Sequence, residues 1–167
     1  IKPASSMKAM HSDMAGAAAV VGATEAISSN QLPCNVIGVI AATENLIDGK
    51  AFKNGDIVGS MKGSTIEVNN TDAEGRLTLA DALYYAATKL EPIAIVDLAT
   101  LTGAAIAAVS GKCTAMIASD DSLAQAVLQA SEAAAEPTQR LLAFPSHYEQ
   151  IKGTYADLDN SPAGGGG

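Results

Sequence analysis

A short acidic segment at residues 70–77, NTDAEGRL, combines residue types and a spacing that could do chemistry. It places Asp72, Glu74 and Arg76 at every second position, and in an extended segment such side chains project from the same face. Two neighbouring carboxylates resist ionising together unless a cation lies between them. Asp and Glu oxygens suit Zn, Mn or Mg, and an adjacent Arg could hold an anion or a developing negative charge. The segment therefore predicts a divalent-metal site, with a solvated acidic turn before a helix as the alternative.

The hydrophobic pattern along the chain predicts the helices that must position this segment. Apolar residues at helical spacing indicate helices at residues 7–29 and 77–90. A further helix is expected from residue 120 onward, ended or interrupted by Pro137, and a short one at 145–152. The acidic segment thus leads directly into the second of these helices.

Apolar runs between the helices predict the strands. Continuous runs at 35–43 and 93–98 fit strands buried on both faces, and shorter strands are expected at 57–61, 65–68 and 112–119. Strands that alternate with helices indicate an α/β layered fold. We therefore predict an α/β fold with a mixed, largely parallel sheet that is flanked by helices on both faces.

Composition limits the function classes. A chain of 167 residues with 48% hydrophobic content suits a single domain, and a net charge of −8 argues against a nucleic-acid-binding surface. No apolar run reaches the ~18 residues of a membrane span. Cys34 and Cys113 stand in no metal-type spacing, so we expect two buried thiols in a reducing compartment. No signal peptide is recognisable, and a cytoplasmic location is expected.

Other segments accompany the acidic one in a fixed order. They are IKP at 1–3, MHSDMAGAAAV at 10–20, NVIGVIAATEN at 35–45, GDIV at 55–58, LTLADA at 77–82 and DLATLTGA at 97–104. Together with NTDAEGRL, these segments resemble the leucyl aminopeptidase (cytosol aminopeptidase) family of metallopeptidases, over most of the chain to about residue 160. The resemblance implies a metallo-aminopeptidase, phosphorylase/hydrolase-like fold. Residues 1–167 would be a single domain, part of that family's C-terminal catalytic domain.

The resemblance also assigns site residues. It implies that Asp13, Asp72 and Glu74 are ligands of two divalent metal ions, Zn and/or Mn or alternatively Mg, with Glu74 bridging both. Lys2 matches the catalytic Lys, which polarises the scissile carbonyl and stabilises the oxyanion. Arg76 matches the catalytic Arg, which holds a bicarbonate that acts as general base on the metal-bridging water. Considered alone, Asp13 would equally be a helix cap and Lys2 a solvated side chain.

Four residues match family positions near the pocket for the first side chain of the substrate, namely Met10, Thr100, Leu101 and Gly103. Met10 alone would be interpreted as ordinary core. Other acids are expected to have no role as ligands: Asp81, Asp97 and Glu44 in structural hydrogen bonds, Asp157 and Asp159 in solvent. His11 and His147 are likewise interpreted as non-ligands, because the family's site needs no His.

One expected part of the site is missing from the sequence. The family supplies a further Lys ligand and a bridging Asp from a G-K-G-x-x-x-D segment just upstream of the position of Lys2, and the chain begins at Ile1. The chain ends in glycines at 164–167, where the family continues through a Gly-rich loop into a further helix. We therefore expect truncation at both ends, with the origin of the glycines left open.

The resemblance implies the release of N-terminal Leu and similar residues from short peptides. It also implies that the full-length protein is a homo-hexamer, as family members are. The alternatives are a truncated, catalytically incompetent domain with a structural or assembly role, and a regulatory DNA-binding role. The acidic charge weighs against the second.

Overall fold

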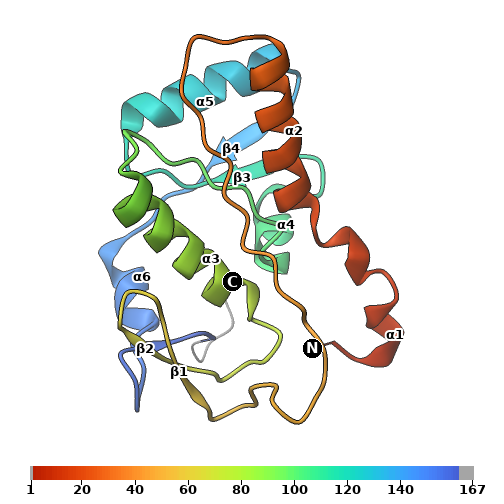
Figure 1. Cartoon of the computed structure of the whole chain (residues 1–167), viewed down its shortest axis with the longest axis vertical. Coiled ribbons are helices and arrows are strands. Elements are labelled where there is room, and N and C mark those ends of the chain that lie inside the picture. Colours follow the sequence, from red (N-terminus) through yellow and green to blue (C-terminus); the bar gives the residue numbers. More distant parts are fainter. Residues whose placement is uncertain (1, 162–167) are drawn as a thin grey trace. The chain divides into compact units, whose positions relative to one another are not determined.

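The structure is a computed structural model that describes residues 2–161 (Figure 1). The chain divides into two compact units. The first unit comprises Ile1–Thr100 and Gly153–Ser161, and the second contains Leu101–Lys152. The acidic segment lies in the first unit, which also receives the returning chain after residue 152.

The helices of the first unit include α1 at Ala4–Met7, the 3₁₀ turn η1 at Met10–Ser12 and α2 at Ala15–Ser29. The expected helix at 7–29 is thus broken before α2, and only the Ala-rich stretch, with its high helix propensity, is continuous. Helix α3, Gly75–Tyr85, continues into a π-helical turn, η2, at Ala86–Leu90. This pair confirms the expected helix at 77–90.

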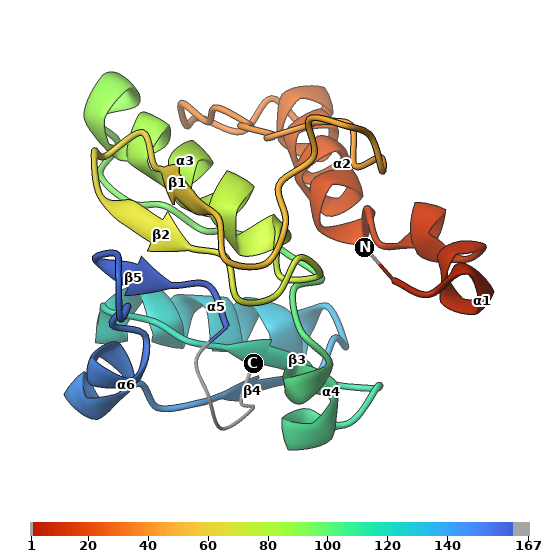
Figure 2. The same ribbon diagram turned by 90° about the horizontal axis from the view of Figure 1, so that it is seen from below.

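A three-stranded mixed sheet completes the first unit. Strand β1, Ile57–Gly59, pairs antiparallel with β2, Thr65–Glu67, and the connecting turn contains Gly63 at a φ of +94°. Glycine adopts such a positive φ without a steric penalty. Strand β5, Leu158–Asp159, pairs parallel with β2, so that Ile66 lies opposite Leu158 (Figure 2). The sheet therefore joins the two separate chain segments that make up the unit.

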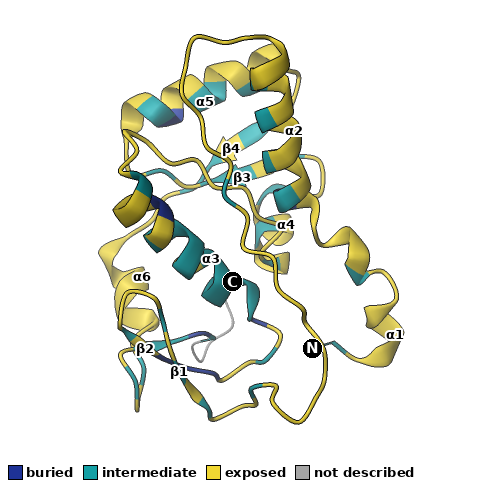
Figure 3. Ribbon diagram, in the orientation of Figure 1, coloured by how far each residue is buried: buried dark blue, intermediate teal, exposed yellow. Residues whose placement is uncertain are grey.

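The buried core of the first unit lies around β2 and the loop before α3. Ile66, Val68 and Ala73 are buried there, together with the polar residues Glu67 and Asn160 (Figure 3). The acidic segment is therefore attached directly to the best-packed part of this unit.

The second unit contains a βαβ arrangement. Strands β3, Thr114–Met116, and β4, Thr138–Arg140, are parallel and are connected through α5, Asp121–Ala133. The Asp120 carboxylate caps α5 by accepting the Leu123 N–H, and α5 ends before Pro137, as predicted. Helices α4, Gly103–Val109, and α6, Pro145–Gln150, flank this arrangement in the sequence. The α/β class with mixed sheets is thereby confirmed.

Two predicted strands are absent from the described residues. The apolar runs at 35–43 and 93–98 form no strand within residues 2–161, and Ile37 and Ile93 are exposed. A strand needs a hydrogen-bonding neighbour, and no described segment pairs with either run.

The prediction of buried cysteines is also wrong, because Cys34 is exposed and Cys113 is half-buried. Among the described residues, no helix is long and apolar enough to cross a membrane.

Candidate functional site

The acidic segment adopts a turn followed by a helix start. Asp72 lies in the turn, Glu74 has helical backbone angles at the N-cap of α3, and Arg76 occupies the first turn of α3. The prediction that an extended backbone aligns these three side chains is therefore wrong. The helix begins at Gly75, and the geometry of a turn and a helix replaces the alternation of a strand.

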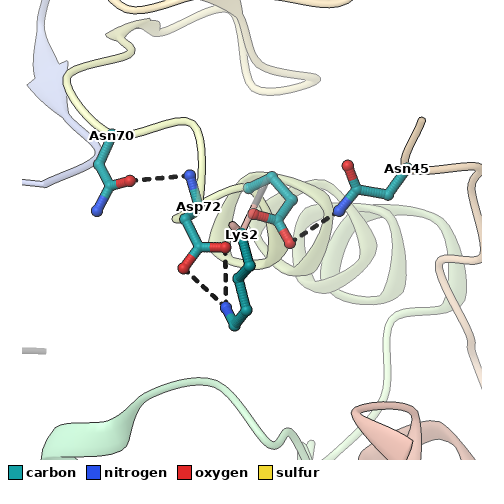
Figure 4. Close-up of polar contacts among 5 residues, drawn as sticks. Lys2, Asn45, Asn70 and Asp72 are labelled. Carbon is teal, nitrogen blue, oxygen red and sulfur yellow. Dashed lines mark hydrogen bonds and ion pairs between the residues drawn. The ribbon is translucent and has the colours of Figure 1, made fainter. Parts of the chain in front are cut away.

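The Asp72 carboxylate is paired with the Lys2 ammonium. Lys2 Nζ donates to both carboxylate oxygens, at 2.8 Å and 2.7 Å, and the Asp72 N–H donates to Asn70 Oδ1 at 2.8 Å (Figure 4). The hydrogen bond to Asp72 raises the pKa of Lys2. The negative charges of Asp72, Glu74 and Asp13 act in the same direction, against a partial desolvation that lowers it. The three predicted ligand acids therefore all contribute to the electrostatic field at Lys2.

Glu74 has one satisfied and one unsatisfied carboxylate oxygen. Its Oε1 accepts from Asn45 Nδ2 at 3.1 Å, whereas its Oε2 is buried and has no hydrogen-bond partner in the described part of the chain. Arg76 Nε is likewise buried without a partner among residues 2–161. Buried polar atoms are nearly always satisfied, so a water molecule or a bound ion would complete the bonding of each of these two atoms, as it would for Arg140 Nε. A cation would satisfy Glu74 Oε2, and an anion would satisfy Arg76 Nε.

Asp13 lies at the end of η1, where its N–H donates to Met10 O at 3.0 Å. Its carbonyl oxygen accepts from Thr100 Oγ1 at 3.2 Å. Close packing supports this contact, because a Cβ on Gly16 of α2 would lie 2.4 Å from the Leu98 carbonyl oxygen. The fold therefore holds the Asp13 turn against the loop that follows residues 93–98.

The described side chains do not by themselves form a complete metal site. Within residues 2–161, the His, Cys, Asp and Glu side chains form no group of three or more arranged to hold a metal ion. The cation beside Asp72 is instead the Lys2 ammonium. The donor set of carboxylates and the unsatisfied Glu74 Oε2 still fit a divalent cation. The ligand roles of Asp13, Asp72 and Glu74 stay predictions.

The residues expected near the substrate pocket are divided between the units. Met10 begins η1 and is half-buried, and Thr100 contacts Asp13, both in the first unit. Leu101 and Gly103 belong to the second unit, where Gly103 is the first residue of α4. Their roles in substrate binding stay predictions.

A pocket of about 340 Å³ in the first unit is lined by Asn45, Thr71 and Glu74, among others.

Sequence reasoning missed the amide side chains around the acidic segment, namely Asn45, Asn70 and Asn160. An Asn two residues before an Asp is a signal for a local side-chain turn, which could have indicated Asn70. No local signal indicates Asn160, because its contacts are 90 residues away. Asp81 does have the expected structural role, since its Oδ1 accepts from the Met61 N–H at 2.8 Å.

Comparison with known proteins decides the family. The model of the cytosol aminopeptidase family, catalytic domain, matches residues 1–167. The chain belongs to this family. It is 52% identical to a probable cytosol aminopeptidase of Clostridium tetani over 161 residues, which is 96% of this chain and 34% of the relative. It is 50% identical to a probable cytosol aminopeptidase of Chlorobium luteolum, covering 100% of this chain and 33% of the relative.

A solved structure agrees with this assignment. A mutant of tomato leucine aminopeptidase matches with a TM-score of 0.83 and 43% identity, over 92% of this chain and 30% of that chain. The chain thus spans about a third of the length of the cytosol aminopeptidases that it matches.

Proposed function

We propose that the protein carrying this chain is a metal-dependent aminopeptidase, which releases N-terminal Leu and similar residues from short peptides. The relatives named cytosol aminopeptidase support the reaction class. The observation that carries the metal dependence is the buried, unpartnered Glu74 Oε2 close to the Lys2–Asp72 ion pair. Family membership does not favour the structural or DNA-binding alternatives.

Asp13, Asp72 and Glu74 would hold two divalent ions, Zn or Mn or alternatively Mg. When bound, such ions would supply Lewis acidity and lower the pKa of the attacking water. Lys2 would place its ammonium against the scissile carbonyl oxygen, where negative charge develops. The raised pKa of Lys2, caused chiefly by its hydrogen bond with Asp72, keeps this group charged and able to donate.

Arg76 would hold a bicarbonate ion through its guanidinium group. Its buried Nε has no partner among the described residues, so a planar anion could accept the free N–H without displacing a protein group. When bound, such an anion would supply a general base for the reaction.

The assembly and location are part of the same proposal. We place the full-length protein in the cytoplasm as a homo-hexamer that admits short peptides. Its relatives are named cytosol aminopeptidases, which supports the location.

The test uses the full-length protein with a Leu-linked chromogenic amide. We expect hydrolysis that a chelator abolishes and that Mn²⁺ or Zn²⁺ restores. Glu74→Gln should eliminate turnover, because it removes the negative charge from the proposed bridging ligand. Glu25→Gln, on the exposed part of α2, is the matched control and should leave turnover unchanged. Hydrolysis that survives the chelator, or full turnover in Glu74→Gln, would refute the proposal.

A further inference from the structure

The Asn160 side chain makes four hydrogen bonds. It follows β5 directly and is only 2% exposed. Its Oδ1 accepts from the Asn69 N–H at 2.9 Å and the Asn70 N–H at 3.1 Å. Its Nδ2 donates to the carbonyls of Asn70 at 2.7 Å and Ala73 at 3.3 Å. Both donors and both acceptor sites of the amide are therefore used.

All four of these hydrogen bonds end on the backbone of the turn that carries Asp72. Asn69 and Asn70 precede Asp72, and Ala73 follows it, so the contacts hold the turn on both sides. The Asn70 side chain continues the connection by accepting the Asp72 N–H at 2.8 Å. Asn160 thus determines the backbone position from which the Asp72 carboxylate is presented.

We propose that Asn160 is a positioning residue for the aminopeptidase site, which acts by fixing the turn that presents Asp72 and leads into Glu74. This inference rests on the proposed function for its catalytic consequence. Its structural consequence, an ordered turn at residues 69–73, can be measured without any activity.

The returning segment is also fastened to the sheet by contacts that do not involve this turn. Asp157 Oδ2 accepts from the Thr65 N–H at 2.8 Å and from Thr65 Oγ1 at 2.9 Å. The buried Glu67 carboxylate accepts from the backbone N–H groups of Tyr155 and Ala156. Asp157 contacts no residue of the turn, whereas Glu67 Oε1 and Asp159 Oδ2 also accept from Asn69 Nδ2, at 3.2 Å and 2.7 Å. Substitution of Asp157 therefore loosens the docked segment without removing a contact to the turn.

The experiment compares three variants of the full-length protein. Asn160→Asp keeps the size and the acceptors but loses both N–H donors, and Asn160→Ala removes the amide without adding charge. Asp157→Ala is the matched control, because it loosens the same segment at Thr65 and contacts no residue of the turn. The measurements are kcat and KM for a Leu-linked chromogenic amide, and backbone amide hydrogen exchange at residues 69–73.

Both Asn160 variants should lower kcat by about 10- to 100-fold with little change in KM, because small misplacements of a catalytic group have effects of this size. They should also speed amide exchange at residues 69–73. Asp157→Ala should change neither kcat nor the exchange of this turn. An equal loss of kcat in Asp157→Ala would overturn the proposal, because docking alone would then explain the effect. Unchanged exchange or unchanged kcat in both Asn160 variants would also overturn it.

Failure of the proposed function is distinguishable from failure of this inference. If the wild-type protein hydrolyses no peptide amide, the proposed function fails, and the exchange measurements alone decide the role of Asn160. If neither Asn160 variant folds, exchange in the wild-type protein decides. The N–H groups of Asn69 and Asn70 must then be protected, and exchange at the rate of an open loop would overturn the inference.

Discussion

The ammonium of Lys2 lies 2.8 Å and 2.7 Å from the two carboxylate oxygens of Asp72, although the residues are 70 positions apart in the chain. The side chains are 33% and 38% exposed. This exposure matters because partly solvated ion pairs contribute little to stability, typically about 0–1 kcal/mol. A structural contribution of this pair is therefore expected to be small, so that a functional role of Lys2 can be tested separately from stability.

The first prediction separates these two roles. Lys2→Ala in the full-length protein should change the free energy of unfolding by less than about 1 kcal/mol. It should lower turnover by about 100- to 1000-fold, the usual consequence of losing one oxyanion donor. Denaturant titration and steady-state kinetics measure the two effects, and metal stoichiometry should stay unchanged. Unaltered turnover, or loss of bound metal, would contradict the assigned role.

The second prediction concerns Arg76, whose buried Nε is unpartnered in the described residues. Arg76→Ala should remove any dependence of the rate on bicarbonate, because the anion loses its guanidinium partner. Arg76→Lys keeps the charge without the planar fork and should recover only part of the rate. Kinetics across a bicarbonate series measures this. A bicarbonate response that persists in Arg76→Ala would show that the anion binds elsewhere.

The third prediction concerns the packing behind Asp13. A Cβ on Gly16 would lie 2.4 Å from the Leu98 carbonyl oxygen and 2.7 Å from the Ala99 Cα. Gly16→Ala should therefore destabilise the protein by about 1–3 kcal/mol, the usual cost of overpacking. Gly22→Ala, in the same helix, meets nothing within 4 Å and should stabilise by up to about 1 kcal/mol. Denaturant titration compares them, and equal effects would contradict the close approach.

The fourth prediction concerns pH. The backbone N–H of Tyr155, with further donors, lowers the pKa of Glu67, and the N–H and hydroxyl of Thr65 lower the pKa of Asp157. A carboxyl whose pKa is lower in the folded state contributes stability that is present above its unfolded pKa. That contribution is lost as pH falls through the folded pKa.

Stability should accordingly decline below the unfolded pKa values of about 4.3 for Glu and about 3.9 for Asp. Denaturant titrations at pH values from 7 down to below these reference pKa values measure the decline. Glu67→Gln and Asp157→Asn should each make the decline shallower. An unchanged pH profile in both variants would show that these carboxylates do not account for it.

Local pattern was sufficient for several elements of the fold. Asp120 followed by apolar residues at helical spacing predicted the start of α5, and Pro137 predicted that it ends. The strands expected at 57–61 and 65–68 are present as the β1–β2 pair, and Gly63 lies in the short turn between them. Caps, turns and helical periodicity depend on residues a few positions apart, so the sequence displays them directly. Residue type and spacing also singled out Asp72, Glu74 and Arg76 as a candidate site, whereas Lys2 and Asp13 were indicated only by resemblance to a family.

Contacts between distant segments were decided only by the tertiary structure. Asp157 is exposed, as expected of a solvated acid, yet its carboxylate binds Thr65, and the supposedly solvated Asp159 accepts from Asn69 Nδ2 at 2.7 Å. The apolar run at 35–43 predicted a strand, but strand formation also requires a hydrogen-bonding neighbour. Asn160 has no local sequence signal that sets it apart from other polar residues. In the fold it is buried and hydrogen-bonds to the backbone of the turn that carries Asp72. Composition and periodicity determine what a segment can do locally, whereas the partner of each hydrogen bond is fixed only when segments 90 residues apart come together.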